Sequence, residues 1–311
     1  MTERHKSAMG YHPWLHRFAV ATAGATLLLI VAGALVTSNQ AGLAVPDWPL
    51  SYGTWMPPMV GGIFYEHGHR MIGASVGLLT IILALWLWRA ERRSWLRRLG
   101  FIGVAVVVLQ GVLGGITVLY LLPWPVSVGH ASLAQLFFCL MVSLALFTSK
   151  SWQEEAPPLT EEGVPSLSRL SIATALAVFV QLVLGATVRH HVLGIAPHLL
   201  GAALVVVLVA WMVRRVLLHH KQTALQQPAK ALAILTALQL ALGTGSYLAR
   251  LATADAPQPQ SLMVALTVAH VAAGALLLAT SVVLALQAHR FFDQRSAVES
   301  RLFPATQRVH S

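Results

Sequence analysis

Residues 66–88, EHGHRMIGASVGLLTIILALWLW, join a short polar opening to a long apolar run. His69 stands where the run begins, and Gly73 follows it four residues later. Positions i and i+4 lie on the same face of a helix, so this spacing leaves a gap free of side chain beside the imidazole. The stretch predicts a membrane-spanning helix that presents a histidine near its entry.

The same pattern, a histidine followed four residues later by Gly or Ala, occurs in three further apolar runs, at His130 with Ala134, His198 with Ala202 and His270 with Gly274. An imidazole beside a gap suits a flat macrocycle whose iron the ring can ligate, and histidine is a standard axial ligand of haem. Two of the histidines fall in each half of the chain. We therefore predict one haem site at His69 and His130 and a second at His198 and His270.

The composition is that of an integral membrane protein. Of the 311 residues, 56% are hydrophobic and only 10% are charged, and the mean hydropathy is +0.68. The formal net charge of +10 lies in short clusters between apolar runs. Because that distribution encodes membrane topology, we predict no nucleic-acid partner. The single cysteine, Cys139, cannot form an intrachain disulfide or a cysteine-based metal cluster.

Eight apolar runs are long enough to cross a lipid bilayer, which takes about 20 residues. They lie at 16–37, 68–88, 99–121, 129–148, 169–189, 196–217, 230–250 and 263–288. The first run is longer than the apolar core of a usual secretory signal and no small-x-small cleavage site closes it, so we expect it to be retained. The predicted fold class is an all-α integral membrane protein with eight transmembrane helices.

Basic residues gather before the first run and after the second, fourth, sixth and eighth, as in Arg4 and Lys6, Arg89 to Arg98, Lys150 and Arg169, Arg214 to Lys230, and Arg290 to Arg301. Lys and Arg favour the cytoplasmic side of a membrane. We therefore predict a plasma-membrane protein with both termini in the cytoplasm and the four histidines in the outer half of the bilayer. His219, His220 and His289 are then cytoplasmic and have no predicted role.

A small-residue pair recurs near the outer end of the odd-numbered runs, as Gly33-Ala34, Gly114-Gly115, Gly185-Ala186 and Gly243-Thr244. The residue four places before the pair is Leu29 in the first run and Gln110, Gln181 and Gln239 in the others. Four hairpins of this kind predict two pseudo-repeated four-helix bundles, whose interiors are where bundles place cofactors. Simple packing of the glycines and interhelical hydrogen bonding by the glutamines are open alternatives.

These repeats divide the chain into four parts. The N-terminal bundle takes residues 1–149, a cytoplasmic linker takes 150–168, the C-terminal bundle takes 169–290 and a cytoplasmic tail takes 291–311. One intramembrane histidine alone is as well explained by packing, but ionisable residues in spans are costly and four at matching positions favour ligation. Zinc is disfavoured because no Cys, Asp or third His clusters with either pair.

Glu66 lies three residues before His69, so both share a helix face if the helix begins one turn earlier. A carboxylate beside a haem can accept a proton or stabilise positive charge. A loop carboxylate, or one that complements the helix dipole, explains the residue equally well. Arg70 and Arg189 are candidates for haem propionates or lipid headgroups, and His67, His190 and His191 are expected at the interface, with the last two within reach of the second site's outer rim.

These features resemble the heme A synthase family. The loop GLAVPDWP at residues 42–49 is similar to that family's Gly-Leu-x-Cys-Pro-Asp-Trp-Pro loop, and Glu66-x-x-His69-Arg70 is similar to its Glu-x-x-His-Arg signature. His130, His198 and His270 fall where the family's other histidines fall. The resemblance covers roughly residues 15–290.

The resemblance implies oxygen-dependent oxidation of the C8 methyl of heme O to a formyl group, for cytochrome oxidase assembly. It implies heme b as cofactor at His198 and His270, and heme O as substrate at His69 and His130. Glu66 would then be catalytic, and Arg70 would bind the substrate haem. Implied partners are molecular oxygen, an unidentified electron donor, heme O synthase and cytochrome oxidase assembly factors, and a homo-oligomer stays open.

Many members of that family carry a cysteine pair in the first outer loop, where this chain has Val45 and Ser51. A step that depends on those thiols cannot operate here, so the chain resembles a cysteine-less branch. Two other functions remain open from the sequence: a di-haem b-type membrane electron-transfer protein, and a haem carrier without oxidase chemistry. The sequence leaves open the substrate entry path and the origin of the formyl oxygen.

Overall fold

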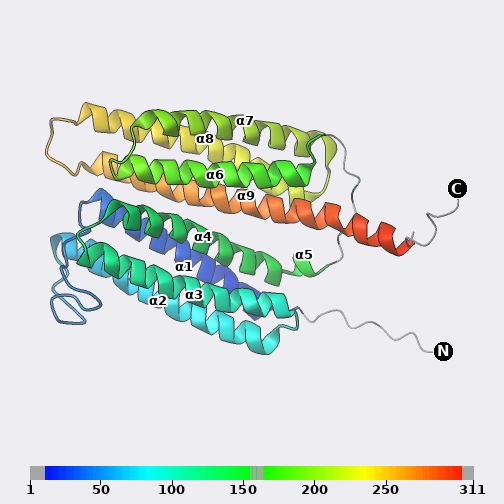
Figure 1. Cartoon of the computed structure of the whole chain (residues 1–311), viewed down its shortest axis with the longest axis horizontal. Helices are drawn as coiled ribbons and strands as arrows, with labels where there is room; N and C mark the ends of the chain where they lie inside the picture. The colour runs from blue at the N-terminus through cyan, green and yellow to red at the C-terminus, as the bar shows by residue number, and fades with distance from the viewer. Residues whose placement is uncertain (1–10, 155, 157–158, 160–163, 303–311) are drawn as a thin grey trace.

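The computed structural model describes residues 11–154, 156, 159 and 164–302, with side chains described as far as residue 292. Arg4 and Lys6, part of the predicted linker and the end of the predicted tail lie outside these residues. The described part is helical and has no β-strand (Figure 1). Its helices are α1 Pro13–Ser38, α2 Gly61–Ala90, α3 Ser94–Leu119, α4 Trp124–Thr148, α5 Lys150–Gln153, α6 Leu167–Arg189, α7 Ile195–His219, α8 Thr223–Ala252 and α9 Ser261–Leu302.

Eight of these helices, all except the short α5, are long and apolar enough to cross a membrane. The predicted all-α fold with eight transmembrane helices is therefore confirmed, and the protein is a multi-pass membrane protein. Each long helix satisfies its own backbone hydrogen bonds, which is what allows a chain to cross hydrocarbon.

All eight long helices begin earlier than the apolar runs predict, and α2 and α4 show the reason. α2 begins at Gly61 after the extended residue Val60, so its first turns contain the polar residues Glu66 and His69. α4 begins at Trp124 with a proline in its first turn, a position where the missing N–H of proline costs no intrahelical bond. Hydropathy alone placed these helix starts too late because polar or proline-containing turns precede the apolar residues.

The long helices pack in two groups of four (Figure 1). In the first group, α1 contacts α2 and α4, and α3 contacts the same two helices. In the second, α7 packs between α6 and α8, and α9 packs against α6 and α8. Contacts of α9 with α1 and α4, and of α4 with α6, join the groups. The pseudo-repeat and the domain boundaries drawn from the sequence remain predictions.

In the second helix group the apolar core lies at the end away from His198 and His270. The buried residues of α6 end at Val178, those of α7 begin at Val205 and those of α8 end at Thr236. Nearer the histidines, the described side chains of these three helices are half-buried or exposed. The histidine end of the second group is therefore its less tightly filled end, although protein interiors are otherwise close-packed.

Candidate haem sites

Each of the four histidines packs its ring against a glycine on the preceding long helix. A Cβ atom added to Gly33 would lie 3.1 Å from Cε1 of His69, and one added to Gly114 would lie 3.5 Å from Cε1 of His130. The corresponding distances are 3.1 Å from Gly185 to His198 and 2.8 Å from Gly243 to His270. These glycines are the first members of the small-residue pairs, so each pair provides a seat for an imidazole.

The three intramembrane glutamines hold the histidine-bearing helices in register with these seats. Gln110 Nε2 donates to the carbonyl of His130 (3.1 Å), and Gln181 Nε2 donates to the carbonyl of His198 (2.8 Å). Gln239 Nε2 lies 3.3 Å from Nε2 of His270. The side-chain oxygens of all three glutamines are buried without a hydrogen-bond partner. The glutamines thus act across helices, and each keeps a buried acceptor without a partner.

The C-terminal pair has a separation suited to one metal ion. The ring centroids of His198 and His270 lie 6.5 Å apart, with an angle of 75° between the ring planes. Metal–imidazole bonds are about 2 Å long, so two such bonds plus the distance from each nitrogen to its ring centre span a gap of this size. His198 Nδ1 lies 3.0 Å from Gln181 Nε2, and His270 Nδ1 lies 3.2 Å from the carbonyl of Gln239. These contacts orient both rings.

The N-terminal pair lies in the first helix group, on α2 and α4. Both histidines are half-buried. Their Nδ1 atoms are buried and have no hydrogen-bond partner. Ring nitrogens that are buried and unpaired are costly unless something binds them, so His69 and His130 also fit a haem that has histidine ligands.

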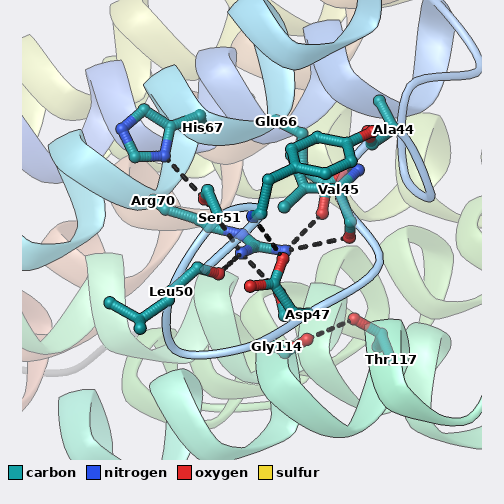
Figure 2. A network of polar contacts seen from close by, with 11 residues as sticks. Ala44, Val45, Asp47, Leu50, Ser51, Glu66, His67, Arg70, Gly114 and Thr117 are labelled. Atoms are coloured by element: carbon teal, nitrogen blue, oxygen red, sulfur yellow. Dashed lines mark hydrogen bonds and ion pairs between the residues drawn. The ribbon is translucent and has the colours of Figure 1, made fainter. Parts of the chain in front are cut away.

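Glu66 is buried under the loop that joins α1 to α2, with 4% of its surface exposed. Its Oε2 accepts a hydrogen bond from the backbone N–H of Val45 (2.8 Å), and its Oε1 forms an ion pair with Arg70 (2.6 Å). The three residues are shown in Figure 2. Glu66 is therefore neither a surface carboxylate nor free at the helix entry, because the loop and Arg70 fix both of its oxygens.

Arg70 also binds the loop itself. Its Nη1 donates to the carbonyls of Asp47 and Leu50 (both 2.8 Å) and its Nη2 donates to the carbonyl of Val45 (3.3 Å) (Figure 2). The pattern of the sequence gave no sign of these partners because they are backbone carbonyls. In this arrangement the donors of Arg70 are taken up by the loop and Glu66, and a contact with a haem propionate remains a prediction.

Val45 and Ser51, which replace the cysteines of many family members, are both buried, with 0% and 1% exposed. Ser51 Oγ lies 2.8 Å from Nδ1 of His67 and accepts a hydrogen bond from Arg70. His67 is 6% exposed, so it is buried within the protein, and its expected depth at the membrane interface remains a prediction. Its partner is a loop serine, which brings the ring inside.

Two polar residues at the outer end of α6, Arg189 and His190, are both half-buried. Arg189 is half-buried and donates to Ser38 Oγ (3.3 Å) across the two helix groups. His190 is half-buried, and burial together with the charge of Arg189 lowers the pKa of its imidazole.

Asp47 accepts hydrogen bonds from the N–H groups of Tyr52 (2.6 Å) and Gly53 (2.8 Å), and the bond from Gly53 is the main cause of the lowered pKa of this carboxyl.

These features define a polytopic membrane protein with paired intramembrane histidines seated on glycines. The model of the COX15-CtaA family, described as cytochrome oxidase assembly protein, matches residues 60–197. The heme A synthase of Symbiobacterium thermophilum is 34% identical over 261 residues, which cover 74% of this chain and 84% of that protein. The chain belongs to the heme A synthase family.

Other relatives match shorter parts of the chain. The heme A synthase of Shouchella clausii is 29% identical over 185 residues, which cover 58% of this chain and 60% of that protein. The heme A synthase of Ruegeria pomeroyi is 34% identical over 140 residues, which cover 42% of this chain and 35% of that protein.

A substitution at a glycine seat tests the fit of the histidines. In Gly243→Ala the new Cβ would meet Cε1 of His270 at 2.8 Å, whereas in Gly245→Ala it would meet Leu266 at an ordinary 3.6 Å. Overpacking costs about 1–3 kcal/mol, so Gly243→Ala should weaken haem retention and lower the reduced b-type absorbance per polypeptide. Gly245→Ala is the control. Equal absorbance in the two variants would contradict the seat.

Removing Arg70 should open the outer loop. Arg70→Ala leaves Glu66 buried without its ion-pair partner, and breaking a buried pair typically costs about 3–5 kcal/mol. We expect faster amide hydrogen exchange over residues 45–54 and a lower Tm, both measured in detergent or nanodiscs. Arg98→Ala, at an exposed arginine, is the control. Unchanged exchange in Arg70→Ala would show that the loop does not depend on this guanidinium.

Proposed function

We propose that this protein is a heme A synthase, which oxidises the C8 methyl of heme O to a formyl group with molecular oxygen. Family membership and the two histidine pairs support this proposal. The observation that carries it is the asymmetry between the pairs: a buried carboxylate, Glu66, lies one turn from His69, whereas the described surroundings of His198 and His270 contain no such group. One site has the residues for chemistry and the other those for holding a redox group.

In this proposal His198 and His270 would hold the iron of heme b, and that group would supply one-electron transfer when bound. The fit rests on the 6.5 Å separation of the rings and on the weakly filled interior around them. Gln181 and Gln239 orient the two imidazoles, as groups around a metal site commonly do for its ligands.

His69 and His130 bind heme O, the substrate, in the N-terminal group. Glu66 then serves as a proton acceptor or stabilises positive charge during oxidation of the methyl group. The N–H of Val45 and the guanidinium of Arg70 hold the carboxylate still. The loop they fix joins α1 to α2 at this end of the first helix group.

The proposal also assigns a location and partners. The basic clusters support a plasma-membrane protein with both termini in the cytoplasm, which puts the haem sites near the outer face. A heme O synthase would supply the substrate, cytochrome oxidase assembly would consume the product, and an external donor would supply electrons. Val45 and Ser51 are not redox-active, so no step uses a thiol in this loop.

Co-expression with a heme O synthase tests the activity directly. Haems extracted from such membranes should include heme A, identified by chromatography and mass analysis. Glu66→Gln should still bind haem but accumulate heme O and no heme A, because the amide cannot accept the proton. Heme O alone in the wild-type sample, with good expression and a working electron supply, would contradict the proposal, and unchanged heme A in Glu66→Gln would remove the role of Glu66.

Substitutions at the C-terminal pair test the site of the cofactor. His198→Ala or His270→Ala should abolish the low-spin b-type spectrum of the purified reduced protein, because an axial ligand is lost. His219→Ala, at an exposed histidine on α7, should leave it intact. Full retention of the spectrum in both of the first two variants would place the cofactor elsewhere.

A further inference from the structure

Trp48 has an unusually close contact with α3. A Cβ atom added to Gly115 would lie 2.6 Å from Cδ2, 2.8 Å from Cε2 and 2.9 Å from Cε3 of the Trp48 ring. Only glycine allows this approach, because any Cβ would overlap the indole. The indole of this outer-loop tryptophan therefore packs directly against the backbone of the membrane-spanning helix α3.

The contact lies one residue along α3 from the contact of His130. Gly115 follows Gly114, and Gly114 seats the ring of His130. Two consecutive positions of α3 thus receive an aromatic ring each, one from α4 and one from the loop. The loop segment carrying Trp48 is fixed by Arg70, which binds the carbonyls of the flanking residues Asp47 and Leu50 (Figure 2).

The indole is only partly covered by the protein. Trp48 is 39% exposed although the glycine beneath it is buried. Trp55, in the same loop, is 78% exposed. Trp48 therefore has one part packed on α3 and another part free to contact a ligand, and aromatic walls with a few polar groups are typical of sites for flat organic ligands.

We propose that Trp48 is a substrate-positioning residue, whose indole forms a wall of the N-terminal site and packs against the porphyrin of heme O beside His130. This inference rests on the proposed function. Gly115 contributes to this arrangement, since the absence of a Cβ determines how closely the indole approaches α3. The contact orients the macrocycle through packing, and it involves no bond-making step.

The test compares substrate haem with cofactor haem in the same molecules. Each variant is made in a Glu66→Gln parent, co-expressed with a heme O synthase, and purified. The ratio of heme O to heme b is then measured by extraction and chromatography. Trp48→Ala should lower the ratio by roughly fivefold to tenfold, the size expected for the loss of one stacked aromatic contact. Heme b serves as an internal reference for folding.

Matched variants separate positioning from loop architecture. Gly115→Ala, which displaces the indole, should lower the ratio, whereas Gly111→Ala, where an added Cβ meets nothing within 4 Å, should not. Trp48→Phe should restore much of the ratio, and Trp55→Ala should leave it unchanged. Amide exchange over residues 45–54 should stay slow in Trp48→Ala, because Arg70 still holds the loop.

Three results would overturn the inference. A normal ratio in Trp48→Ala overturns it alone. A lowered ratio accompanied by fast exchange of the loop, without rescue by Trp48→Phe, assigns Trp48 to loop structure instead. A parent that contains heme b but no heme O contradicts the proposed function and removes this inference with it.

Discussion

The structure depends on the contact between an imidazole and the backbone of a neighbouring helix, made possible by a missing side chain. At Gly33, Gly185 and Gly243 the ring of a histidine lies closer than an added Cβ would normally allow, and at Gly114 the ring of His130 is at ordinary contact distance. Hydrocarbon provides no hydrophobic drive for helix association, so close backbone approach is what holds such helices together. The same contact fixes each ring, and a fixed ring is a better metal ligand than a mobile one because less freedom is lost on binding.

The histidine ends of the bundles contrast with the opposite ends. Large side chains such as Leu83, Met141 and Met212 are completely buried at the opposite end, where they hold the helices together without a ligand. Around His198 and His270 the side chains of α6, α7 and α8 are half-buried or exposed, and the side-chain oxygens of Gln181 and Gln239 have no partner. A protein can keep such an incompletely packed region only because the rest of the core stabilises it. Stability and binding are thus divided along the length of the helices.

The sequence predicted the eight helices and the pairing of histidines by helix group, since apolar length and i,i+4 spacing are local signals. It identified the small-residue pairs but left their purpose open, because a seat exists only when the next helix supplies a ring. It missed the early start of α2 at Gly61, the loop network around Arg70 and the contact of Trp48 with Gly115. Those contacts involve backbone atoms or residues far apart in the chain, and neither leaves a pattern in the sequence.

The most direct test of the account is an experimental map of the protein purified with its haem. We predict iron density between His198 and His270, with Nε2 or Nδ1 of each ring as a ligand and each ring still against Gly185 or Gly243. A second macrocycle would lie between His69 and His130 under the outer loop. Haem bound outside these pairs, or imidazoles turned toward lipid, would contradict the central claim.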